Sequence, residues 1–309
     1  MTKINEIIKR FLFNTFTEKM PRGFKTRGKK IVTFEIDPLY PIMDFPKRDF
    51  NYKYFAGEMA WYIKKENTTD FIKKFSSFWE NIKNPDGKTI NSNYGHILLG
   101  NHPSSETAKN QLAFAFNSLV KDRDSRQAVA FLNCPYFQFE GNKDFVCTMY
   151  LNFFIEEGKL NMKVQMRSND IFFGLSYDAP FFSSIMQSMY LNLKNIYEDL
   201  ELGTYYHCAD DIHYYERHFD LVDVIKNTPS EKDVRMELSH PLFHFVKTGE
   251  SYSLALSAST LSFAEDVELV ANTSSFKNID EEGWKAILSK IVTFETSFGT
   301  MEELRSTVQ

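Results

Sequence analysis

The chain has 309 residues, of which 43% are hydrophobic and 25% charged, an ordinary composition for a soluble globular protein. Its 30 phenylalanines indicate a well-filled core and exclude a disordered chain. The formal net charge of −5 provides no global attraction for a nucleic-acid polymer, although a few arginines suffice to bind the phosphate of one nucleotide.

The three cysteines are Cys134, Cys147 and Cys208, an odd number spaced too widely for a zinc motif. They suit free thiols in a reducing cytoplasm, and they permit a catalytic cysteine. The first residues lack the long apolar core of a signal peptide, and no apolar run reaches membrane-spanning length. We therefore expect a soluble cytoplasmic protein with no membrane and no nucleic-acid polymer as partner, and no bound metal.

The first part of the chain combines a helix, a strand and a loop. Residues 4–16 carry apolar side chains at helical spacing and predict an amphipathic helix. The basic segment 21–30 leads into an alternating strand at 30–36. Three prolines then predict a loop over 38–46.

Two more helices are expected over 55–65 and 69–82, separated by a short polar segment. The stretch 84–95 is rich in turn-forming residues. Residues 127–133 then read as a strand, which begins a region of extended structure.

The strands 147–155 and 159–167 predict a hairpin around the segment EEGK. In its second arm, alternation with a period of two places Arg167 on the polar face. A long helix is expected over 180–200, opened by its proline. Residues 204–215 read as one or two strands.

After about residue 226 the pattern becomes mostly helical, and it contains no residue that we can assign to chemistry. We therefore divide the chain into residues 1–225 and a mainly helical extension, 226–309, that packs on them.

Single residues of chemical interest are ambiguous. A cysteine in an apolar strand, such as Cys147, is most often a small buried hydrophobe, and a nucleophile needs positive neighbours that lower its pKa. Arg126 and Arg167 are candidates for that field and for phosphate binding, yet each alone is more often a surface arginine. The order of the whole set carries more information.

Taken in order, the segments DFVCTMYLNFF, MRSNDIFFGLSYD and ADDIHYYERHF resemble the thymidylate synthase superfamily, over roughly residues 50–222. The Cys-Thr pair at 147–148, the NSNYG and MRSND segments and Asp178 are similar to the phage-type deoxycytidylate hydroxymethylases. The resemblance implies an α/β (α+β) fold with a mixed β-sheet flanked by helices, and a catalytic domain in residues 1–225.

The resemblance also implies a role for each matched residue. The implied catalytic residues are Cys147 as nucleophile, Glu58 and Tyr94 for proton transfer, and Asp178 at the pyrimidine. Phosphate is implied to bind Arg126, Arg167 and Ser168, with Arg126 reaching across the interface of a homodimer. By the same resemblance, Gly174 is expected beside the pyrimidine, and His213 and Tyr215 are expected to bind the sugar 3′-hydroxyl. The folate cofactor, 5,10-methylenetetrahydrofolate, is implied to meet Glu58, Trp79 and Asp170.

Several positions depart from the thymidylate synthase pattern. Thr148 replaces the histidine after the nucleophile, and Asn152 stands in place of a glutamine. Gln127 replaces a second phosphate arginine, which weakens one expected contact. The amino-terminal phosphate arginine corresponds to either Lys25 or Arg27, and the carboxyl-terminal segment that closes thymidylate synthases has no counterpart.

Asp178 is the departure with the clearest chemical meaning, since thymidylate synthases carry asparagine there. An amide donates to the uracil carbonyl and accepts from the ring N–H. An ionised carboxylate instead accepts from the cytosine amino group. A proton shared between the carboxyl group and the ring nitrogen lets Asp178 pair with both polar positions of cytosine. Asp178 therefore favours cytosine. The alternative is that it merely caps the helix expected near Pro180.

Together with Asp178, the resemblance implies a transferase that hydroxymethylates deoxycytidylate (dCMP), with dCMP and folate as its partners. Cys147 adds to carbon 6 of the pyrimidine, carbon 5 takes up the one-carbon unit, and water rather than hydride completes the reaction. Three alternatives stay open: a dCMP 5-methyltransferase, a hydroxymethylase of the ribonucleotide CMP, and a catalytically idle relative that only binds.

Overall fold

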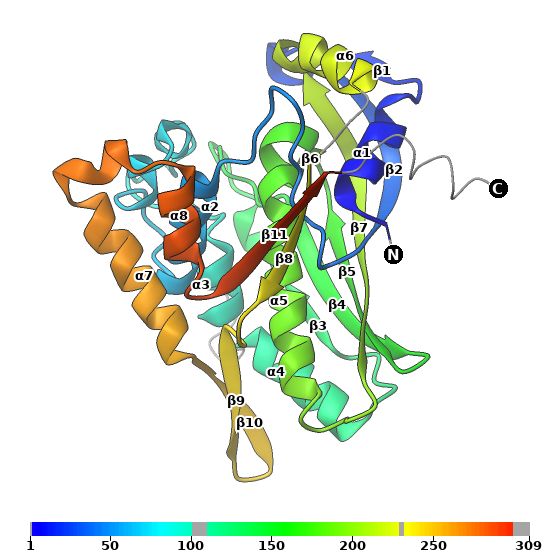
Figure 1. The fold of residues 1–309 in the computed structure, drawn as a ribbon, viewed down its shortest axis with the longest axis vertical. Coiled ribbons are helices and arrows are strands. Elements are labelled where there is room, and N and C mark those ends of the chain that lie inside the picture. Colours follow the sequence, from blue (N-terminus) through cyan, green and yellow to red (C-terminus); the bar gives the residue numbers. More distant parts are fainter. Residues whose placement is uncertain (1, 101–109, 229–231, 299–309) are drawn as a thin grey trace.

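The structure is a computed structural model that describes residues 2–100, 110–228 and 232–298. Within these residues, the central sheet has seven strands in the order β1-β2-β7-β5-β4-β3, with β6 beside β7 (Figure 1). The strands are β1 (Thr17–Lys19), β2 (Thr26–Ile36), β3 (Val129–Phe131), β4 (Thr148–Glu156), β5 (Lys159–Met166), β6 (Asn169–Asp170) and β7 (Glu201–Tyr215). Because β7 is parallel to β5 and β6 but antiparallel to β2, the sheet is mixed, which confirms the expected fold class.

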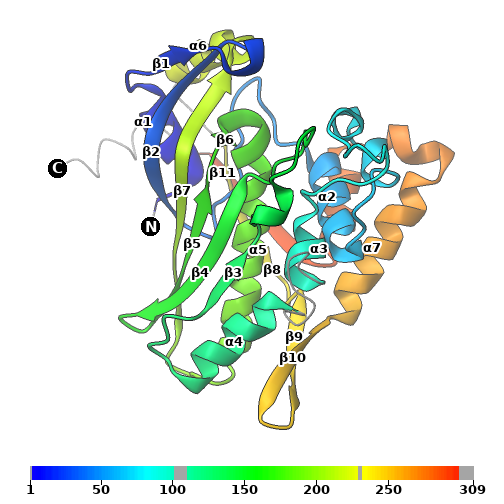
Figure 2. The same ribbon diagram turned by 180° about the vertical axis from the view of Figure 1, so that it is seen from behind.

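Helix α5 (Ser176–Leu193) packs on one face of this sheet and is buried along most of its length. Its small residues permit close packing, and the Ser184 hydroxyl donates to the Pro180 carbonyl oxygen at 2.9 Å. The other helices of the described chain are α1 (Ile4–Leu12), α2 (Tyr52–Lys64), α3 (Tyr94–Leu99), α4 (Gln111–Lys121), α6 (Phe219–Asn227), α7 (Ala258–Ala271) and α8 (Glu281–Leu288). Figures 1 and 2 show α2, α3, α7 and α8 grouped on the side of α5 away from the sheet.

The predicted hairpin is confirmed, and its turn explains its register. Glu157 and Gly158 have φ angles of +51° and +75°, the left-handed conformations that a tight two-residue hairpin turn requires. The turn pairs Glu156 with Lys159 and thereby fixes the alignment of β4 with β5.

The alternation of buried and more exposed side chains along β7 shifts by one residue near the middle of the strand. Tyr205 and His207 are buried, whereas His213 and Tyr215 are half-buried, although all four have odd numbers. The change occurs beside Ile31 of β2, where the regular pairing is interrupted and φ is +53°. One strand therefore presents two histidines to two different environments.

The prediction of one helix over 69–82 is wrong. The structure has two short 3-10 helices there, Ile72–Lys74 and Ser77–Asn81, separated by the extended backbone of Ser76. The ring of Phe75 fills the space above a glycine of α2. Tertiary packing of this aromatic side chain therefore overrides the helical pattern.

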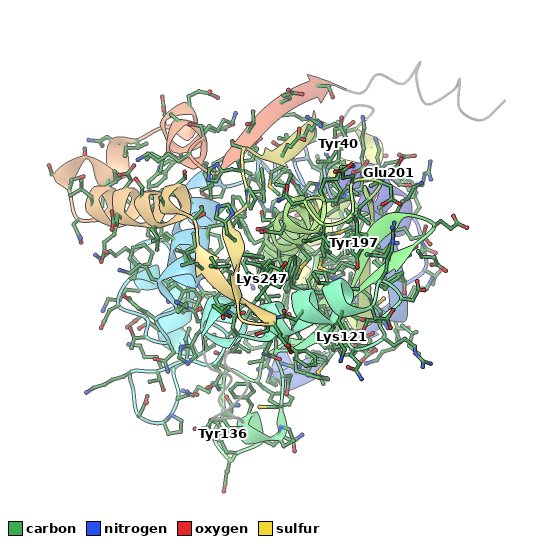
Figure 3. All side chains as sticks on the ribbon, turned by 90° about the horizontal axis from the view of Figure 1, so that it is seen from below. Tyr40, Lys121, Tyr136, Tyr197, Glu201 and Lys247 are labelled. Atoms are coloured by element: carbon green, nitrogen blue, oxygen red, sulfur yellow. The ribbon has the colours of Figure 1, made fainter. Side chains whose placement is uncertain are left out.

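The helix expected over 180–200 begins earlier and ends earlier. A π-helical turn, Ile171–Leu175, leads directly into α5, and Asp170 caps it by accepting from the backbone N–H groups of Phe172 and Phe173. The start signal was thus Asp170 rather than Pro180, which lies inside the helix. At the other end, the Tyr197 hydroxyl (labelled in Figure 3) donates to the Leu119 carbonyl oxygen of α4 at 2.7 Å.

The prediction that the region after residue 226 is mainly helical is also wrong. Besides α7 and α8 it contains the strands β8 (Lys232–Leu238), β9 (Phe243–Thr248), β10 (Ser251–Leu256) and β11 (Val292–Phe298). β9 and β10 form a hairpin that projects from the body, whereas β8 pairs with the distant β11 (Figure 1). The side chains of these elements join the same hydrophobic core as α2 and α5. Residues 299–309 of the expected extension lie outside the described residues.

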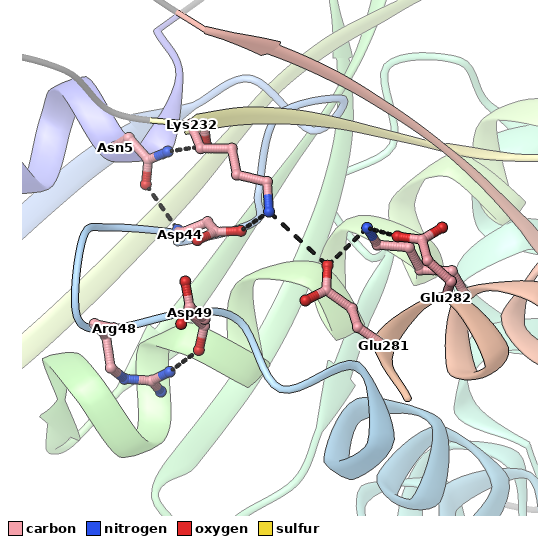
Figure 4. Close-up of polar contacts among 8 residues, drawn as sticks. Asn5, Asp44, Arg48, Asp49, Lys232, Glu281 and Glu282 are labelled. Carbon is pink, nitrogen blue, oxygen red and sulfur yellow. Dashed lines mark hydrogen bonds and ion pairs between the residues drawn. The ribbon is translucent and has the colours of Figure 1, made fainter. Parts of the chain in front are cut away.

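A partly buried ion pair connects this region to the first part of the chain (Figure 4). Lys232 Nζ lies 3.3 Å from Asp44 Oδ2 and 3.8 Å from Glu281 Oε1. Asn5 closes the cluster, since it donates to the Lys232 carbonyl oxygen at 2.9 Å and accepts from the Asp44 N–H at 3.1 Å. Burial raises the pKa of Asp44, and the Lys232 charge opposes that rise.

We expect the substitution Lys232→Met to lower the free energy of unfolding by about 1–3 kcal/mol at pH 7, because it leaves a buried carboxylate without its counter-charge. The folded-state pKa of Asp44 lies above the unfolded value, and it rises further without Lys232. Protonated Asp44 needs no counter-charge, so the loss shrinks as the pH falls toward 4. Urea unfolding at pH 7 and pH 4.5 measures this difference. Lys73→Met, in the exposed Lys73–Asp70 pair, is the control, and an equal loss at both pH values would contradict the prediction.

Among the described residues, no helix is both long and apolar enough to cross a membrane.

Candidate active site

Side chains from α2, α3, the start of β4 and the start of α5 converge beside the carboxyl ends of β5 and β6. They are Glu58, Tyr94, Cys147 and Asp178, and the Asp178 carboxyl group lies close enough to raise the pKa of each of the other three. The structure therefore brings together the four residues predicted to be catalytic.

The thiol of Cys147 lies against a fixed guanidinium. Arg167 Nη2 is 3.4 Å from Cys147 Sγ, and the guanidinium is held by the Val146 carbonyl oxygen at 3.1 Å and by the Phe145 carbonyl oxygen. Burial raises the pKa of the Cys147 thiol, and the Arg167 charge opposes this rise. Arg167 therefore stabilises the thiolate, which is the nucleophilic form.

A basic hollow of about 470 Å³ lies next to Arg167. It is lined by Lys19, Pro21, Thr26, Lys30, Arg167, Ser168, Asp211 and His213. Asp211 pairs with Lys19 at 3.0 Å and with Lys30 at 2.6 Å, so two of the three cations are already partly neutralised. The Tyr215 ring packs edge-on against His213 at 5.4 Å. Arg167 and Ser168 thus lie together in a place suited to a phosphate, with His213 and Tyr215 adjacent.

Glu58 is a buried carboxyl group with a short chain of donors behind it. The Tyr54 hydroxyl donates to Glu58 Oε1 at 2.9 Å, and the Trp79 indole N–H donates to the Tyr54 oxygen at 3.2 Å. Burial raises the pKa of Glu58 to about 8; the Tyr54 hydrogen bond opposes this rise, and the Asp178 charge adds to it. Glu58 therefore carries a proton at neutral pH and can exchange it near pH 8.

Asp178 lies in the first turn of α5, but it caps no backbone N–H. Its Oδ2 instead accepts from the Asn169 side-chain amide at 2.7 Å. Burial raises the pKa of Asp178 to about 7, and the hydrogen bond from Asn169 opposes the rise. The alternative that Asp178 merely caps the helix does not describe the structure, because Asp170 is the capping residue.

Gly174 is required by this arrangement. A Cβ atom at this position would lie 2.6 Å from Asn169 Nδ2 and 3.3 Å from Asp178 Oδ2. Only glycine lets the two side chains meet at this distance.

Tyr94 is stacked between other aromatic rings, 5.6 Å from Tyr62 and 5.7 Å from Phe182. Burial raises the pKa of Tyr94 well above its usual value, and the hydroxyl contacts Thr148. Tyr94 is therefore a neutral hydroxyl near the thiol, able to donate or relay a proton.

A comparison with known families identifies this arrangement. The model of the thymidylate synthase family matches residues 17–249 of the chain. The chain belongs to the thymidylate synthase family.

Individual relatives within this family differ in the base that they modify. The deoxycytidylate 5-hydroxymethyltransferase of Enterobacteria phage T2 is 30% identical over 185 residues, which cover 58% of this chain and 73% of that protein. The deoxyuridylate hydroxymethyltransferase of Bacillus phage SP01 is 28% identical over 205 residues, which cover 63% of this chain and 52% of that protein. The thermostable thymidylate synthase A from Bacillus subtilis shares the fold, with a TM-score of 0.59 and 20% identity over 82% of this chain and 93% of that one. The chain is thus a one-carbon transferase of the thymidylate synthase family.

Within one chain, the structure does not bring Arg126 to the site. Arg126 is exposed in the loop between α4 and β3, and β3 pairs with β4 so that Val129 faces Asn152. Continuing that register places Arg126 near the far end of β4, about 25 Å of strand away from Cys147.

The two candidates for the amino-terminal phosphate arginine of the thymidylate synthase family are engaged elsewhere. Lys25 lies 3.6 Å from Glu18, and Arg27 lies 2.9 Å from the same carboxylate. The sequence analysis missed Arg22, whose charge is close enough to Cys147 to lower the pKa of that thiol. The sequence signal for Arg22 was its place in the basic segment, next to Gly23. In the structure these two residues form a tight turn, with φ angles of +53° and +82°.

The residues that the family resemblance implies for the folate fit that role. Asp170 Oδ1 caps the following turn, while its buried Oδ2 has no hydrogen-bond partner among the described residues. That oxygen can accept an N–H of a bound ring. Trp79 is linked to Glu58 through the Tyr54 hydroxyl, so a ligand at Trp79 would be connected to the proton-transfer group by two hydrogen bonds.

We expect Glu58→Gln to reduce kcat by about 10²–10⁴-fold, because the variant loses a proton-transfer group.

The same variant should be more stable than the wild type at pH 8. The folded-state pKa of Glu58, about 8, lies above the unfolded value of roughly 4.3, so ionisation costs stability as the pH rises between them. We expect a gain on the order of 1–3 kcal/mol at pH 8 that vanishes near pH 4. Kinetics and thermal unfolding measure the two effects, with exposed Glu66→Gln as the control; unchanged kcat would exclude Glu58 from proton transfer.

Proposed function

We propose that the protein is a dCMP hydroxymethylase, which forms 5-hydroxymethyl-dCMP from dCMP, water and 5,10-methylenetetrahydrofolate. The observation that carries the proposal is the identity and place of Asp178, a carboxyl group rather than an amide, next to the Cys147 thiol. The similarity to the deoxycytidylate hydroxymethyltransferase of phage T2 supports it.

The surroundings of Asp178 favour cytosine over uracil. Asn169 donates to Oδ2 and keeps that oxygen an acceptor, so Oδ1 is the oxygen that can carry a proton toward a base. An ionised Oδ1 accepts from the cytosine amino group but repels the uracil carbonyl oxygen. A pKa of about 7 also allows Asp178 to share a proton with the ring nitrogen of cytosine at neutral pH. Leaving a buried polar group mispaired costs about 1–3 kcal/mol, which is enough for a clear preference.

The reaction begins with addition of the Cys147 thiolate, stabilised by Arg167, to carbon 6 of the pyrimidine. Carbon 5 thereby becomes nucleophilic. The bound folate would supply the one-carbon unit at the oxidation level of formaldehyde and be released as tetrahydrofolate, which leaves an exocyclic methylene carbon on the nucleotide. Glu58 and Tyr94 exchange protons with the ring and with water. Water adds its oxygen to the exocyclic methylene carbon of the nucleotide, and the electron pair of the carbon–sulfur bond returns to Cys147.

The phosphate and sugar of the nucleotide are assigned to the basic hollow. Arg167 and Ser168 bind the phosphate with help from Arg22, while His213 and Tyr215 bind the sugar 3′-hydroxyl.

We further infer a homodimer in which Arg126 serves the partner's site. The face of the sheet away from α5 carries an exposed Phe131 and a stacked pair, Phe154 and Tyr206, and no described helix covers β4 and β5 there (Figure 2). Such a face suits a second sheet.

Mixing two inactive variants tests the shared site. Arg126→Glu and Cys147→Ser damage different sites of a dimer, so mixing them should restore activity through subunit exchange. Arg167→Glu is the matched control, because Arg167 and Cys147 belong to the same site and their mixture should stay inactive. Size-exclusion chromatography with light scattering measures the assembly, and rescue in neither mixture would contradict the trans role of Arg126.

The product decides the proposed reaction. The protein is incubated with methylenetetrahydrofolate and an equimolar mixture of dCMP, dUMP and CMP, and the nucleotides are identified by mass. We expect dCMP to gain one carbon, two hydrogens and one oxygen. A product without the added oxygen would indicate methyl transfer, a modified CMP would indicate the ribonucleotide, and no product would indicate a binding protein. Modification of dUMP alone would overturn the assignment of Asp178.

A further inference from the structure

Behind Asp178 and Asn169 lies a buried chain of hydrogen bonds whose inner members, Tyr205 and His207, have no part in the steps above. The Tyr205 hydroxyl is 2.7 Å from His207 Nδ1, His207 Nε2 is 3.1 Å from Asn169 Oδ1, and Asn169 Nδ2 is 2.7 Å from Asp178 Oδ2. Tyr205 and His207 are 0% exposed, and Asn169 is 4% exposed. We call Tyr205, His207 and Asn169 the relay.

The direction of these hydrogen bonds follows from the donors. Burial lowers the pKa of His207 to about 3, so the ring is neutral and carries a single N–H. The only hydrogen-bond partner of the Tyr205 hydroxyl among the described residues is His207 Nδ1, so Tyr205 donates to it. The ring proton therefore sits on Nε2 and is donated to Asn169 Oδ1.

This direction fixes the orientation of the Asn169 amide. With its oxygen held by His207, Asn169 must point its NH₂ group at Asp178 Oδ2. The opposite direction would leave the buried Tyr205 O–H without an acceptor, which is costly. Gly174 provides the space for the amide, as shown above.

We propose that Tyr205, His207 and Asn169 are positioning residues for Asp178, which hold Oδ2 as an acceptor and so confine any proton of this carboxyl group to Oδ1, facing the base. The inference rests on the proposed function. Its consequence is that the choice of cytosine depends on three residues in addition to Asp178. Without the relay, the carboxyl group could rotate and present either oxygen to the base, protonated or not, and discrimination would weaken.

Other titratable groups surround Asp178 and must stay unchanged in a test. Glu58 and Tyr62 face it from α2, Tyr94 from α3, and Cys147 from the start of β4. Variants of the relay alter none of them.

The test compares Asn169→Ala and Tyr205→Phe with the wild type. Equilibrium dissociation constants for dCMP and for dUMP are measured by titration calorimetry between pH 5 and pH 9. For Asn169→Ala we expect dCMP binding to weaken about tenfold or more, while dUMP binding changes less than about threefold. The midpoint of the pH dependence of dCMP binding should rise, because the donor that opposes protonation of Asp178 is gone. Tyr205→Phe should act in the same directions to a smaller extent.

Ser183→Ala is the matched control, since this buried hydroxyl of α5 has no hydrogen-bond partner among the described residues. It should leave both dissociation constants and the midpoint unchanged. If the relay had a purely structural role, its variants would weaken the binding of both nucleotides equally and would not shift the midpoint of the pH dependence. That result would overturn the proposal. If Asn169→Ala fails to fold, the nearly isosteric Tyr205→Phe decides. A wild type that prefers dUMP would overturn the proposed function itself, a result separate from the fate of the relay.

Discussion

Replacing Cys147 with serine should abolish product formation, with kcat falling by at least about 10⁴-fold. A serine hydroxyl is nearly the same size but remains protonated beside Arg167, so it cannot add to carbon 6 of the pyrimidine. The phosphate and sugar contacts lie on other residues, and dCMP should therefore bind within about threefold of the wild-type affinity. Single-turnover assays with product identified by mass, together with calorimetry of dCMP binding, measure the two quantities.

The other two cysteines provide matched controls for this substitution. Cys134 and Cys208 are also half-buried free thiols, and the Thr33 hydroxyl donates to the Cys208 thiol at 3.4 Å. Their serine variants should retain activity within about twofold. If Cys147→Ser retained full activity, the covalent mechanism would be refuted at its first step, whatever the nucleotide.

The parts of the fold that the sequence predicted are those controlled by neighbouring residues. The β4–β5 hairpin follows from strict alternation and from a turn at Glu157 and Gly158, and all its determinants lie within twenty residues of one another. Strand β8 pairs instead with β11, and the pairing of Lys232 with Phe298 joins distant segments. No local pattern encodes such a partner, which is why the region after residue 226 was wrongly expected to be mainly helical.

The candidate site likewise contains residues that neighbouring sequence indicated and residues that only the fold brings together. Cys147, Arg167, Asp170 and Asp178 lie in two short segments whose order resembles a known family, so the sequence pointed to them directly. The residues that tune them act across the fold and were missed. His207 reaches Asp178 through Asn169 of another strand, and the change of phase along β7 separates it from His213. Period-two alternation alone would have placed both histidines on one face.

Glu58 illustrates a property that the sequence cannot show. Its position in a helix of mixed polarity is compatible with an exposed surface residue, whereas the structure buries it beside a second carboxyl group. Two carboxyl groups with pKa values of about 8 and about 7 cannot both ionise freely at neutral pH, and protonation of one favours ionisation of the other. Their shared titration belongs to the three-dimensional arrangement.

Replacing Asp178 with asparagine should reverse the base preference from dCMP to dUMP. The side-chain oxygen of the new amide can accept from Asn169 and from the uracil ring N–H, while its NH₂ group donates to the uracil carbonyl. The same NH₂ group would oppose the cytosine amino group. We expect dCMP affinity to fall about 10–100-fold and dUMP affinity to rise by a comparable factor, which corresponds to about 1–3 kcal/mol for each base.

The pH dependence provides an independent readout of the same substitution. Ionisation of Asp178, whose pKa is about 7, should contribute a limb to wild-type dCMP binding, and this limb should be missing in Asp178→Asn because an amide does not titrate. Asp210→Asn is the matched control, since Asp210 is an exposed residue of β7 that accepts from the Gln165 side chain. It should change neither the preference nor the limb. An Asp178→Asn variant that still preferred dCMP would show that another group reads the base, and both the proposed substrate and the relay would then lose their foundation.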